Sequence, residues 1–309
     1  MGRNKETCIA SDVEAVVTSY NQGTMILEAI RSVCDQTILP VRIIIVDDGS
    51  TDEESVELLE NINTCFESSV PIIVMRQSNG GVSAARNSGI RETQTPMVLV
   101  LDGDDKIESD YIERVRQLLY EDPLMVAASS WMHTFGVLDS IVCPSGGGIV
   151  EFLARNCCPA THILRREIWE TCGGYDETMR SGFEDWDFFL SMLETTPDSR
   201  IGIVTEPLID YRTAPASSNI KSMSKRLELI RFLIEKHMRS YQAHIADAIL
   251  EVESISMSRL YGWESEICHT LSENQNLSRT SDEFMKSPSY GDGGMAAAVR
   301  IASSHDDSK

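Results

Sequence analysis

The sequence has no long apolar run, and no stretch approaches the ~20 consecutive apolar residues of a membrane-spanning helix. Its first residues, Met1 to Glu6, contain no apolar segment of the kind that directs secretion. Neither end carries a signal for lipid attachment. We therefore expect a cytoplasmic protein without a transmembrane segment.

Positive charge is also scarce. The chain has 27 Lys and Arg residues against 48 Asp and Glu residues, which gives a formal net charge of −21 at pH 7. Because such a surface repels phosphate backbones and anionic lipids, we expect no nucleic-acid partner. The 8 cysteines and 6 histidines show no CxxC or Cys/His ligand spacing. The sequence therefore predicts reduced thiols rather than a zinc site or a disulfide framework.

Carboxylates gather at the end of one apolar run. Val98 to Leu101 are apolar and lead directly into Asp102-Gly103-Asp104-Asp105. The run is typical of a strand buried on both faces. Carboxylates this close repel one another and raise each other's pKa unless a cation neutralises them. The pattern fits a hard divalent ion such as Mg²⁺ or Mn²⁺, although Asp-Gly is also a hairpin signal.

A second apolar run also ends in acids. Arg42 to Val46 precede Asp47-Asp48-Gly49-Ser50-Thr51-Asp52, and residues 53–62 then have helical spacing, with Ser50 or Thr51 as the expected cap. Because ligands bind at the carboxyl ends of the strands in open α/β sheets, two acidic turns on that edge indicate a ligand site.

The order of elements predicts an α/β fold with a mostly parallel sheet and helices on both faces. The expected order is strand 13–17, helix 25–33, strand 42–46, helix 53–62, strand 72–75, helix 83–90 and strand 98–101. Further along, we expect helix 110–120, strand 125–131 and a loop over residues 136–148 on the acceptor side.

Six motifs in the same order resemble those of family 2 glycosyltransferases of the GT-A type, over about residues 12–215. They are Thr18-Ser19-Tyr20-Asn21, Val46-Asp47-Asp48-Gly49-Ser50-Thr51-Asp52, Asn79-Gly80-Gly81 with Ala84-Ala85-Arg86-Asn87, Leu101-Asp102-Gly103-Asp104-Asp105, Arg165-Arg166 with Gly173-Gly174-Tyr175-Asp176-Glu177, and Phe183-Glu184-Asp185-Trp186-Asp187. The resemblance implies a GT-A fold, with a Rossmann-like, mostly parallel mixed sheet flanked by helices. It also implies sugar transfer from a nucleoside-diphosphate sugar, with a UDP-sugar the first expectation, to an unidentified acceptor.

The resemblance further implies roles for individual residues. Asp104 lies near the ribose and the metal, and Asp105 completes a site for Mn²⁺ or Mg²⁺. Either Asp47 or Asp48 accepts a hydrogen bond from the base. The residues implied on the nucleotide-sugar side are Thr18, Tyr20, Asn21, Asp47, Asp48, Asn79, Arg86, Asp102, Gly103 and Asp104.

Chemistry on the acceptor requires a base. The acceptor hydroxyl loses a proton as it attacks the anomeric carbon, and a partly desolvated carboxylate can take that proton. The motif position assigns the base to Asp185, with Glu184 as the second choice and inversion at the anomeric carbon as the outcome. Ala214 departs from the family pattern, in which a histidine that helps hold the diphosphate is common. Arg212, Ser217 or Ser218 can substitute for it.

Two other functions stay open at this stage. A nucleotidyltransferase shares a related sheet, but Ser19 to Gly23 contain no Lys or Arg to grip a triphosphate. A non-catalytic nucleotide-sugar-binding scaffold is favoured only by Ala214, since the acidic residues of both motifs are retained.

The expected domains follow from these motifs. They are an N-terminal arm (1–11), a catalytic domain (12–220) with nucleotide-binding (12–105) and acceptor-binding (106–220) halves, C-terminal helices (221–263) and a polar, flexible tail (264–309). We expect one long helix from Ser224 to Trp263, packed on the catalytic domain or forming a homodimer. Within the tail, residues 296–301 have the composition of a short docked helix.

Overall fold

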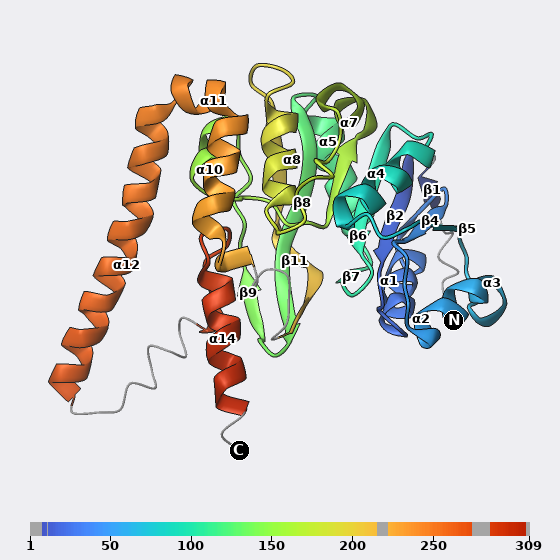
Figure 1. The fold of residues 1–309 in the computed structure, drawn as a ribbon, viewed down its shortest axis with the longest axis horizontal. Helices are drawn as coiled ribbons and strands as arrows, with labels where there is room; N and C mark the ends of the chain where they lie inside the picture. Colours follow the sequence, from blue (N-terminus) through green and yellow to red (C-terminus); the bar gives the residue numbers. More distant parts are fainter. Residues whose placement is uncertain (1–7, 11, 215–221, 274–284, 307–309) are drawn as a thin grey trace, which may run out of the picture.

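The computed structural model describes residues 8–10, 12–214, 222–273 and 285–306. In these residues the main sheet has the strand order β5-β4-β2-β6-β10-β8-β11-β7, with β9 paired to β8. The first four strands run parallel. β10 is antiparallel to both of its neighbours, and β11 runs parallel to β8. Figure 1 shows the parallel half at one end of the molecule and the C-terminal helices at the other.

The strands are β1 Cys8–Ala10, β2 Val13–Ser19, β3 Ile38–Pro40, β4 Ile43–Asp47, β5 Ile72–Arg76, β6 Met97–Asp102, β7 Lys106–Ile107, β8 Met125–Gly136, β9 Ser140–Val142, β10 His162–Arg165 and β11 Arg200–Thr213. The helices are α1 Met25–Cys34, α2 Glu53–Glu60, α3 Ile62–Cys65, α4 Val82–Glu92, α5 Tyr111–Glu121, α6 Ile149–Ala154, α7 Arg166–Cys172, α8 Glu184–Leu193, α10 Arg226–Lys236, α11 Met238–Ala243, α12 Ile245–Glu273 and α14 Gly294–Asp306. The expected alternation of strands and helices over residues 13–101 is confirmed.

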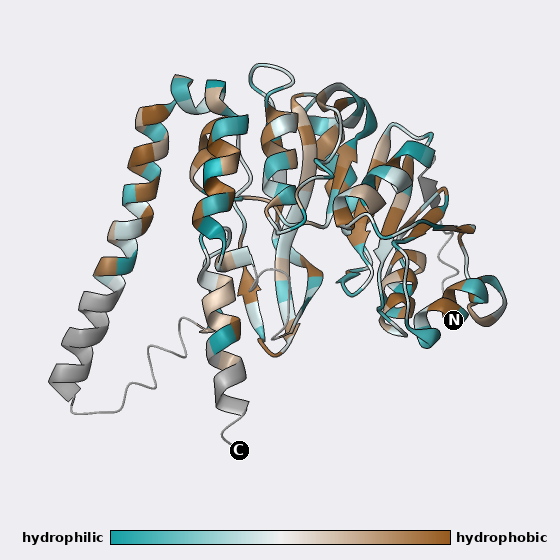
Figure 2. Ribbon diagram, viewed as in Figure 1, coloured by the Kyte–Doolittle hydropathy of each residue, from teal (hydrophilic) through white to brown (hydrophobic). Residues whose placement is uncertain are grey.

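The central strands are buried on both faces, as their unbroken apolar runs predict. In β2, Val13, Ala15 and Val17 face one core cluster, whereas Val16 faces the other. Figure 2 shows hydrophobic residues along the strands between the covering helices. Because helices α1 and α5 cover one face and α4 and α8 the other, the sheet is a rigid platform for its loops.

Two local expectations are wrong. Asp52, not Ser50 or Thr51, caps α2, since its carboxylate accepts a hydrogen bond from the Ser55 amide at 2.8 Å. The residues expected as a loop over 136–148 contain strand β9, because β8 runs on to Gly136 and turns back on itself.

The C-terminal part also differs from expectation. The single helix expected from Ser224 is three helices, α10, α11 and α12, which are interrupted at His237 and His244. Helix α12 continues past residue 263 to Glu273, so the tail does not begin at residue 264. None of the described helices combines the length and hydrophobicity that a membrane crossing requires.

The expected docked helix is present as α14, and it is longer than predicted. Its Ala298 and Val299 side chains are buried against Leu138, in the turn between β8 and β9. Met285, Ala298 and Val299 therefore pack on the sheet domain, which corrects the expectation of a flexible tail for this part of the chain. Residues 274–284 and 307–309 lie outside the described residues.

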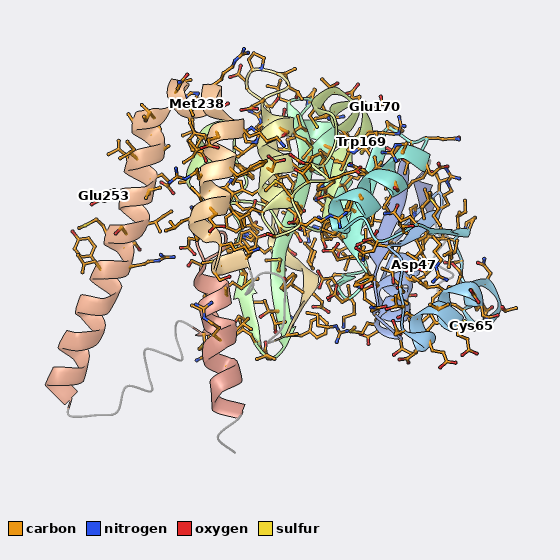
Figure 3. All side chains as sticks on the ribbon, viewed as in Figure 1. Asp47, Cys65, Trp169, Glu170, Met238 and Glu253 are labelled. Atoms are coloured by element: carbon orange, nitrogen blue, oxygen red, sulfur yellow. The ribbon has the colours of Figure 1, made fainter. Side chains whose placement is uncertain are left out.

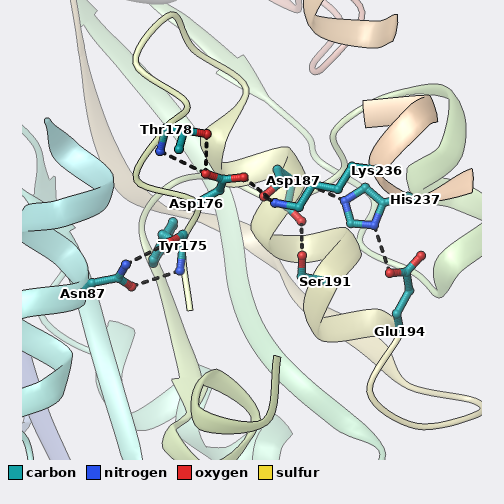
Figure 4. Close-up of polar contacts among 9 residues, drawn as sticks. All are labelled: Asn87, Tyr175, Asp176, Thr178, Asp187, Ser191, Glu194, Lys236 and His237. Carbon is teal, nitrogen blue, oxygen red and sulfur yellow. Dashed lines mark hydrogen bonds and ion pairs between the residues drawn. The ribbon is translucent and has the colours of Figure 1, made fainter. Parts of the chain in front are cut away.

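A buried ionic network joins the C-terminal helices to α8 (Figure 4). Asp187 is fully buried, and its carboxylate accepts from Lys236 Nζ at 2.8 Å and from His237 Nε2 at 3.0 Å. Lys236 also contacts Asp176 at 2.7 Å, and His237 Nδ1 lies 2.9 Å from Glu194. A buried carboxylate needs such partners because burial otherwise disfavours its charge. The network fixes the first turn of α8 against α10.

We expect the fold to depend on the protonation of His237. Burial opposes charge on the ring, but the hydrogen bonds to Asp187 and Glu194 outweigh it and raise the pKa of His237. A raised folded-state pKa means that this stabilisation is complete below the unfolded-state pKa and is lost as pH rises through the folded-state pKa. In thermal unfolding, the wild type should lose this stabilisation as pH rises. His237→Gln should lower Tm at acidic pH and make Tm less dependent on pH. His244→Gln, which alters a partly exposed histidine of the same region, is the control, and equal pH slopes for wild type and His237→Gln would contradict the prediction.

Candidate active site

The two acidic turns meet at one edge of the sheet. In the parallel register Thr18 is paired with Asp102, and Ser19 is paired with Asp47. The carboxyl ends of β2, β4 and β6 therefore lie side by side, as the sequence predicts. Asp47, labelled in Figure 3, marks this edge in the nucleotide-binding half.

A buried arginine links this edge to helix α8. Arg86 is 1% exposed, and its Nη2 donates to both carboxylate oxygens of Asp102 at 2.9 Å. Its Nη1 contacts Asp185 Oδ1 at 2.7 Å and lies 3.8 Å from Glu184. The Tyr175 ring lies 5.3 Å from the guanidinium. Burial opposes the charge of Arg86, but the surrounding carboxylates hold its pKa well above the usual value.

This arrangement corrects the expected role of Arg86. Both Nη atoms of this buried side chain are paired with carboxylates and, within the described part of the chain, only Nε lacks a hydrogen-bond partner, so Arg86 presents almost no surface to a nucleotide. Its contacts join residues 102 and 185, which are far apart in the sequence, and give Arg86 a positioning role beneath the carboxylates. The sequence placed Arg86 in the right motif but could not show what lies around it.

Glu184 and Asp185 occupy the first turn of α8, where the helix dipole favours negative charge. Phe183, which precedes them, has φ 66°, so the chain turns sharply into the helix. Burial raises the pKa of Asp185 to about 7, an effect that Arg86 opposes and that Glu184 and Asp102 reinforce. Burial likewise raises the pKa of Glu184. A carboxylate with this pKa can accept and release a proton near neutral pH.

Asp104 and Asp105 lie beyond Asp102 on the same turn. Burial, followed by the charge of Asp102, raises the pKa of Asp104 to about 6. Asp105 is 2% exposed and accepts a hydrogen bond from the Arg212 amide at 2.8 Å, and burial raises its pKa well above the usual value. Gly103 is required between them, because a Cβ at that position would come within 2.5 Å of the Thr18 carbonyl oxygen.

These carboxylates bear on the expected metal. Within the described residues, no three His, Cys, Asp or Glu side chains converge as a complete metal cage. Asp102 is already bonded to Arg86 and to the Thr18 hydroxyl, at 3.0 Å for the latter. Asp104 and Asp105 each provide a carboxylate with hard oxygen atoms that can bind a metal ion. Among the described residues, few positively charged side chains lie near these two carboxylates to offset their charge. Such a pair fits Mg²⁺ or Mn²⁺, which usually take their other ligands from water and substrate phosphates.

Asp47 and Asp48, the two candidate partners of the base, both accept hydrogen bonds from other residues of this chain. Asp47 accepts from the Ser50 amide at 2.9 Å and lies 3.4 Å from Arg76. Asp48 accepts from the amides of Gly80 and Gly81, each at 2.8 Å. Asp48 thus shapes the loop that presents Asn79, an exposed residue. The choice between Asp47 and Asp48 as the partner of the base stays a prediction.

The first motif divides into two kinds of residue. Tyr20 is 48% exposed and is free to meet a ligand. Asn21 has φ 51°, and its side-chain oxygen accepts from the Thr51 amide at 2.7 Å, so this side chain joins two loops of the site. Thr18 is buried and orients Asp102 rather than lining an open surface.

Sequence reasoning missed two supporting residues, Gln22 and Tyr175, and named Arg212 only as a substitute for the histidine that Ala214 replaces. Gln22 donates to Asp104 at 3.3 Å, and Arg212 donates from Nε to the Asp104 carbonyl at 3.0 Å. Tyr175 stacks on Phe188 beneath Arg86 with ring centroids 3.8 Å apart. Gln22 follows the first motif and Tyr175 lies within the fifth. Their positions in the sequence therefore indicated that they lie near the site, but not which residues they contact.

The model of the family "Glycosyl transferase family 2" matches residues 14–169. The chain is 25% identical over 236 residues to the uncharacterized glycosyltransferase YwdF of Bacillus subtilis, which covers 73% of this chain and 84% of YwdF. It is also 25% identical over 187 residues to hyaluronan synthase of Pasteurella multocida, which covers 59% of this chain but only 19% of that synthase.

Solved structures share the fold. The structure of S. aureus TarS residues 1–349 in complex with UDP matches with a TM-score of 0.56 and 18% identity, over 88% of this chain and 78% of that TarS fragment. The complex of the same TarS fragment with UDP-GlcNAc has a TM-score of 0.56 and 17% identity, over 75% of this chain and 70% of that one. With the family match over half of its length, the chain belongs to glycosyl transferase family 2 and is a glycosyltransferase with a GT-A fold.

Proposed function

We propose that this chain is an inverting glycosyltransferase that moves a sugar from a UDP-sugar to an acceptor hydroxyl. The observation that carries the proposal is the pair of carboxylate groups on either side of Arg86: the Asp102–Asp105 turn and the Glu184–Asp185 pair. UDP and UDP-GlcNAc in the similar TarS structures support the donor class. None of the relatives named above identifies the acceptor of this chain.

Asp185 is the proposed general base. Its carboxylate takes the proton of the acceptor hydroxyl as the hydroxyl oxygen attacks the anomeric carbon and the bond to the diphosphate breaks. One carboxylate acting as base fits a single displacement, which inverts the anomeric configuration. Arg86 holds Asp185 in place, and Glu184 beside it raises the pKa of Asp185 further.

The diphosphate leaves with increasing negative charge. Asp104 and Asp105 are the proposed ligands of Mn²⁺ or Mg²⁺, and a bound divalent ion would neutralise that charge. Arg212 is the proposed substitute for the histidine that Ala214 replaces, because its Nε already lies on the Asp104 carbonyl. Ser217 and Ser218, the other two candidates, lie outside the described residues.

A homodimer through the C-terminal helices is a separate proposal. Ile245, Ile249 and Val252 of α12 are 61%, 62% and 54% exposed and repeat at helical spacing. Ile249→Glu should convert a dimer to a monomer in sedimentation velocity, because the charge cannot be buried in an apolar seam. Ser254→Glu, at another exposed position of the helix, should leave the dimer intact. A wild type that sediments as a monomer at high concentration would refute the dimer.

The base assignment predicts a separation of binding from chemistry. Asp185→Asn keeps the size of the side chain and removes its basicity, so UDP-sugar binding should change little while transfer falls ~10²–10⁴-fold. Glu184→Gln is the matched control and should lose less. The product anomer, read from an NMR coupling constant, should be inverted. Retention of configuration would exclude the mechanism even if both residues proved essential.

The metal assignment predicts cation-dependent nucleotide binding. Calorimetry with UDP should show clearly stronger binding with Mn²⁺ or Mg²⁺ than with EDTA, and Asp104→Asn should remove the difference. Asp110→Asn, which alters a surface carboxylate paired with Arg114, should keep it. Equal UDP affinity with and without metal would show that Asp104 and Asp105 serve another purpose.

A further inference from the structure

Arg180 extends from the acceptor half of the catalytic domain to the start of helix α4. The residue belongs to the loop between α7 and α8, and its side chain is exposed. A Cβ at Gly81 would lie 3.7 Å from Arg180 Cγ and 3.9 Å from Arg180 Nε, so the side chain packs against the Gly81 backbone. Within the described part of the chain, Arg180 makes no hydrogen bond or ion pair. Its guanidinium is therefore available to a ligand.

The loop holds Arg180 at this place. Met179, the preceding residue, is 7% exposed and packs in the core cluster on the α4 and α8 face of the sheet. Ser181, the following residue, accepts a hydrogen bond from Lys225 Nζ at 3.2 Å. Because the chain is fixed on both sides of Arg180, the position of its backbone next to α4 is set by the fold.

The start of α4 has hydrogen-bond donors that the fold leaves unused. No side chain caps the helix at Gly81, whose own amide donates to Asp48 at 2.8 Å. In the first turn of this 11-residue helix, the backbone N–H groups and the helix dipole favour an anion. Ser83, in the same turn, is 2% exposed, and its hydroxyl has no hydrogen-bond partner among the described residues. Because a buried hydroxyl without a partner costs free energy, a ligand that bonds to it would gain affinity.

Ser83 lies on the side of α4 that is turned toward the proposed active site. It precedes Arg86 by three residues, and side chains three positions apart share one face of a helix. On that face Arg86 donates to Asp102 and to Asp185. Arg180 approaches the same end of the helix from the loop that leads into α8. The unpartnered hydroxyl and the unpaired guanidinium therefore both lie at the end of α4 next to these carboxylates.

The other arginines of the site already have partners. Arg86 is paired with carboxylates through both Nη atoms. Arg212 donates from Nε to the Asp104 carbonyl and from Nη2 to Glu28 at 3.1 Å. Arg180 thus brings a positive charge that no described acid offsets, in a region where a negatively charged donor has to bind beside several carboxylates.

We infer that Arg180 and the first turn of α4 form an anion subsite for the sugar donor. The inference rests on the proposed use of a UDP-sugar. Two parts of such a donor can supply the negative oxygens, namely the diphosphate and the carboxylate of a uronic acid sugar. A guanidinium recognises both groups by the same chemistry, since its planar N–H donors match paired anionic oxygens.

Calorimetry in Mg²⁺ with uridine, UDP, UDP-glucose and UDP-glucuronic acid tests the subsite and separates the two sources. If the diphosphate is the anion, Arg180→Ala should weaken binding of UDP and of both UDP-sugars about tenfold and leave uridine unchanged. If the sugar carboxylate is the anion, only UDP-glucuronic acid should bind more weakly, again by about tenfold. Arg180→Lys keeps the charge without the planar donors and should lose less. Unchanged binding of all four ligands in Arg180→Ala would overturn the inference.

Two further variants locate the subsite on the helix. Arg91→Ala is the matched control, because Arg91 is also exposed but lies in the last turn of α4, about 15 Å along the helix from Gly81. This variant should bind every ligand like the wild type. Ser83→Ala removes the unpartnered hydroxyl and should weaken, several-fold, the same ligand that Arg180→Ala weakens. No change in Ser83→Ala would exclude the first turn of α4 from the subsite.

Binding and transfer are measured separately, so the inference and the proposed function can fail independently. Arg180-dependent binding of UDP or UDP-glucuronic acid, in a protein that releases no UDP from any donor, would support the subsite and contradict the proposed transfer. UDP release that depends on Asp185, with every ligand bound equally by Arg180→Ala and wild type, would support the transfer and refute the subsite. A wild type that binds none of the UDP ligands would refute both.

Discussion

The buried Arg86 guanidinium is the interaction on which the site depends. It is removed from water and paired with carboxylates from β6 and from α8, so the first turn of α8 cannot move without leaving a buried charge unpaired. One guanidinium does not balance all the acids around it. Asp104 and Asp105 remain on the same turn, and this excess of negative charge is the physical reason for the proposed divalent ion.

The C-terminal helices act on the site through α8. Lys236 and His237 of the α10 region hold Asp187, two residues after the proposed base (Figure 4). Arg86 holds the base itself from the sheet side. The helix is therefore fixed from both sides. This explains how a region outside the sheet contributes to the geometry of Asp185 without touching a substrate.

The family match covers residues 14–169 and ends before α8. The nucleotide-binding half lies within it, and the proposed base and Arg180 lie beyond it. The match therefore covers the expected nucleotide-binding half and also residues 106–169 of the expected acceptor-binding half.

The sequence by itself determined the nucleotide-binding half. Apolar runs such as Val98 to Leu101 specify buried strands, and the acids that follow them must meet because parallel strands end at one edge. It also placed Asp104, Asp105, Glu184 and Asp185 in the right turns, because local motifs set these positions. The burial of Arg86, the ionic network of Asp187 and the hydrogen bond from Tyr290 to the Cys158 carbonyl were decided only by tertiary structure. Each joins residues tens to hundreds of positions apart, and no local spacing records such contacts, because they form only when the sheet, α8 and the C-terminal helices pack together.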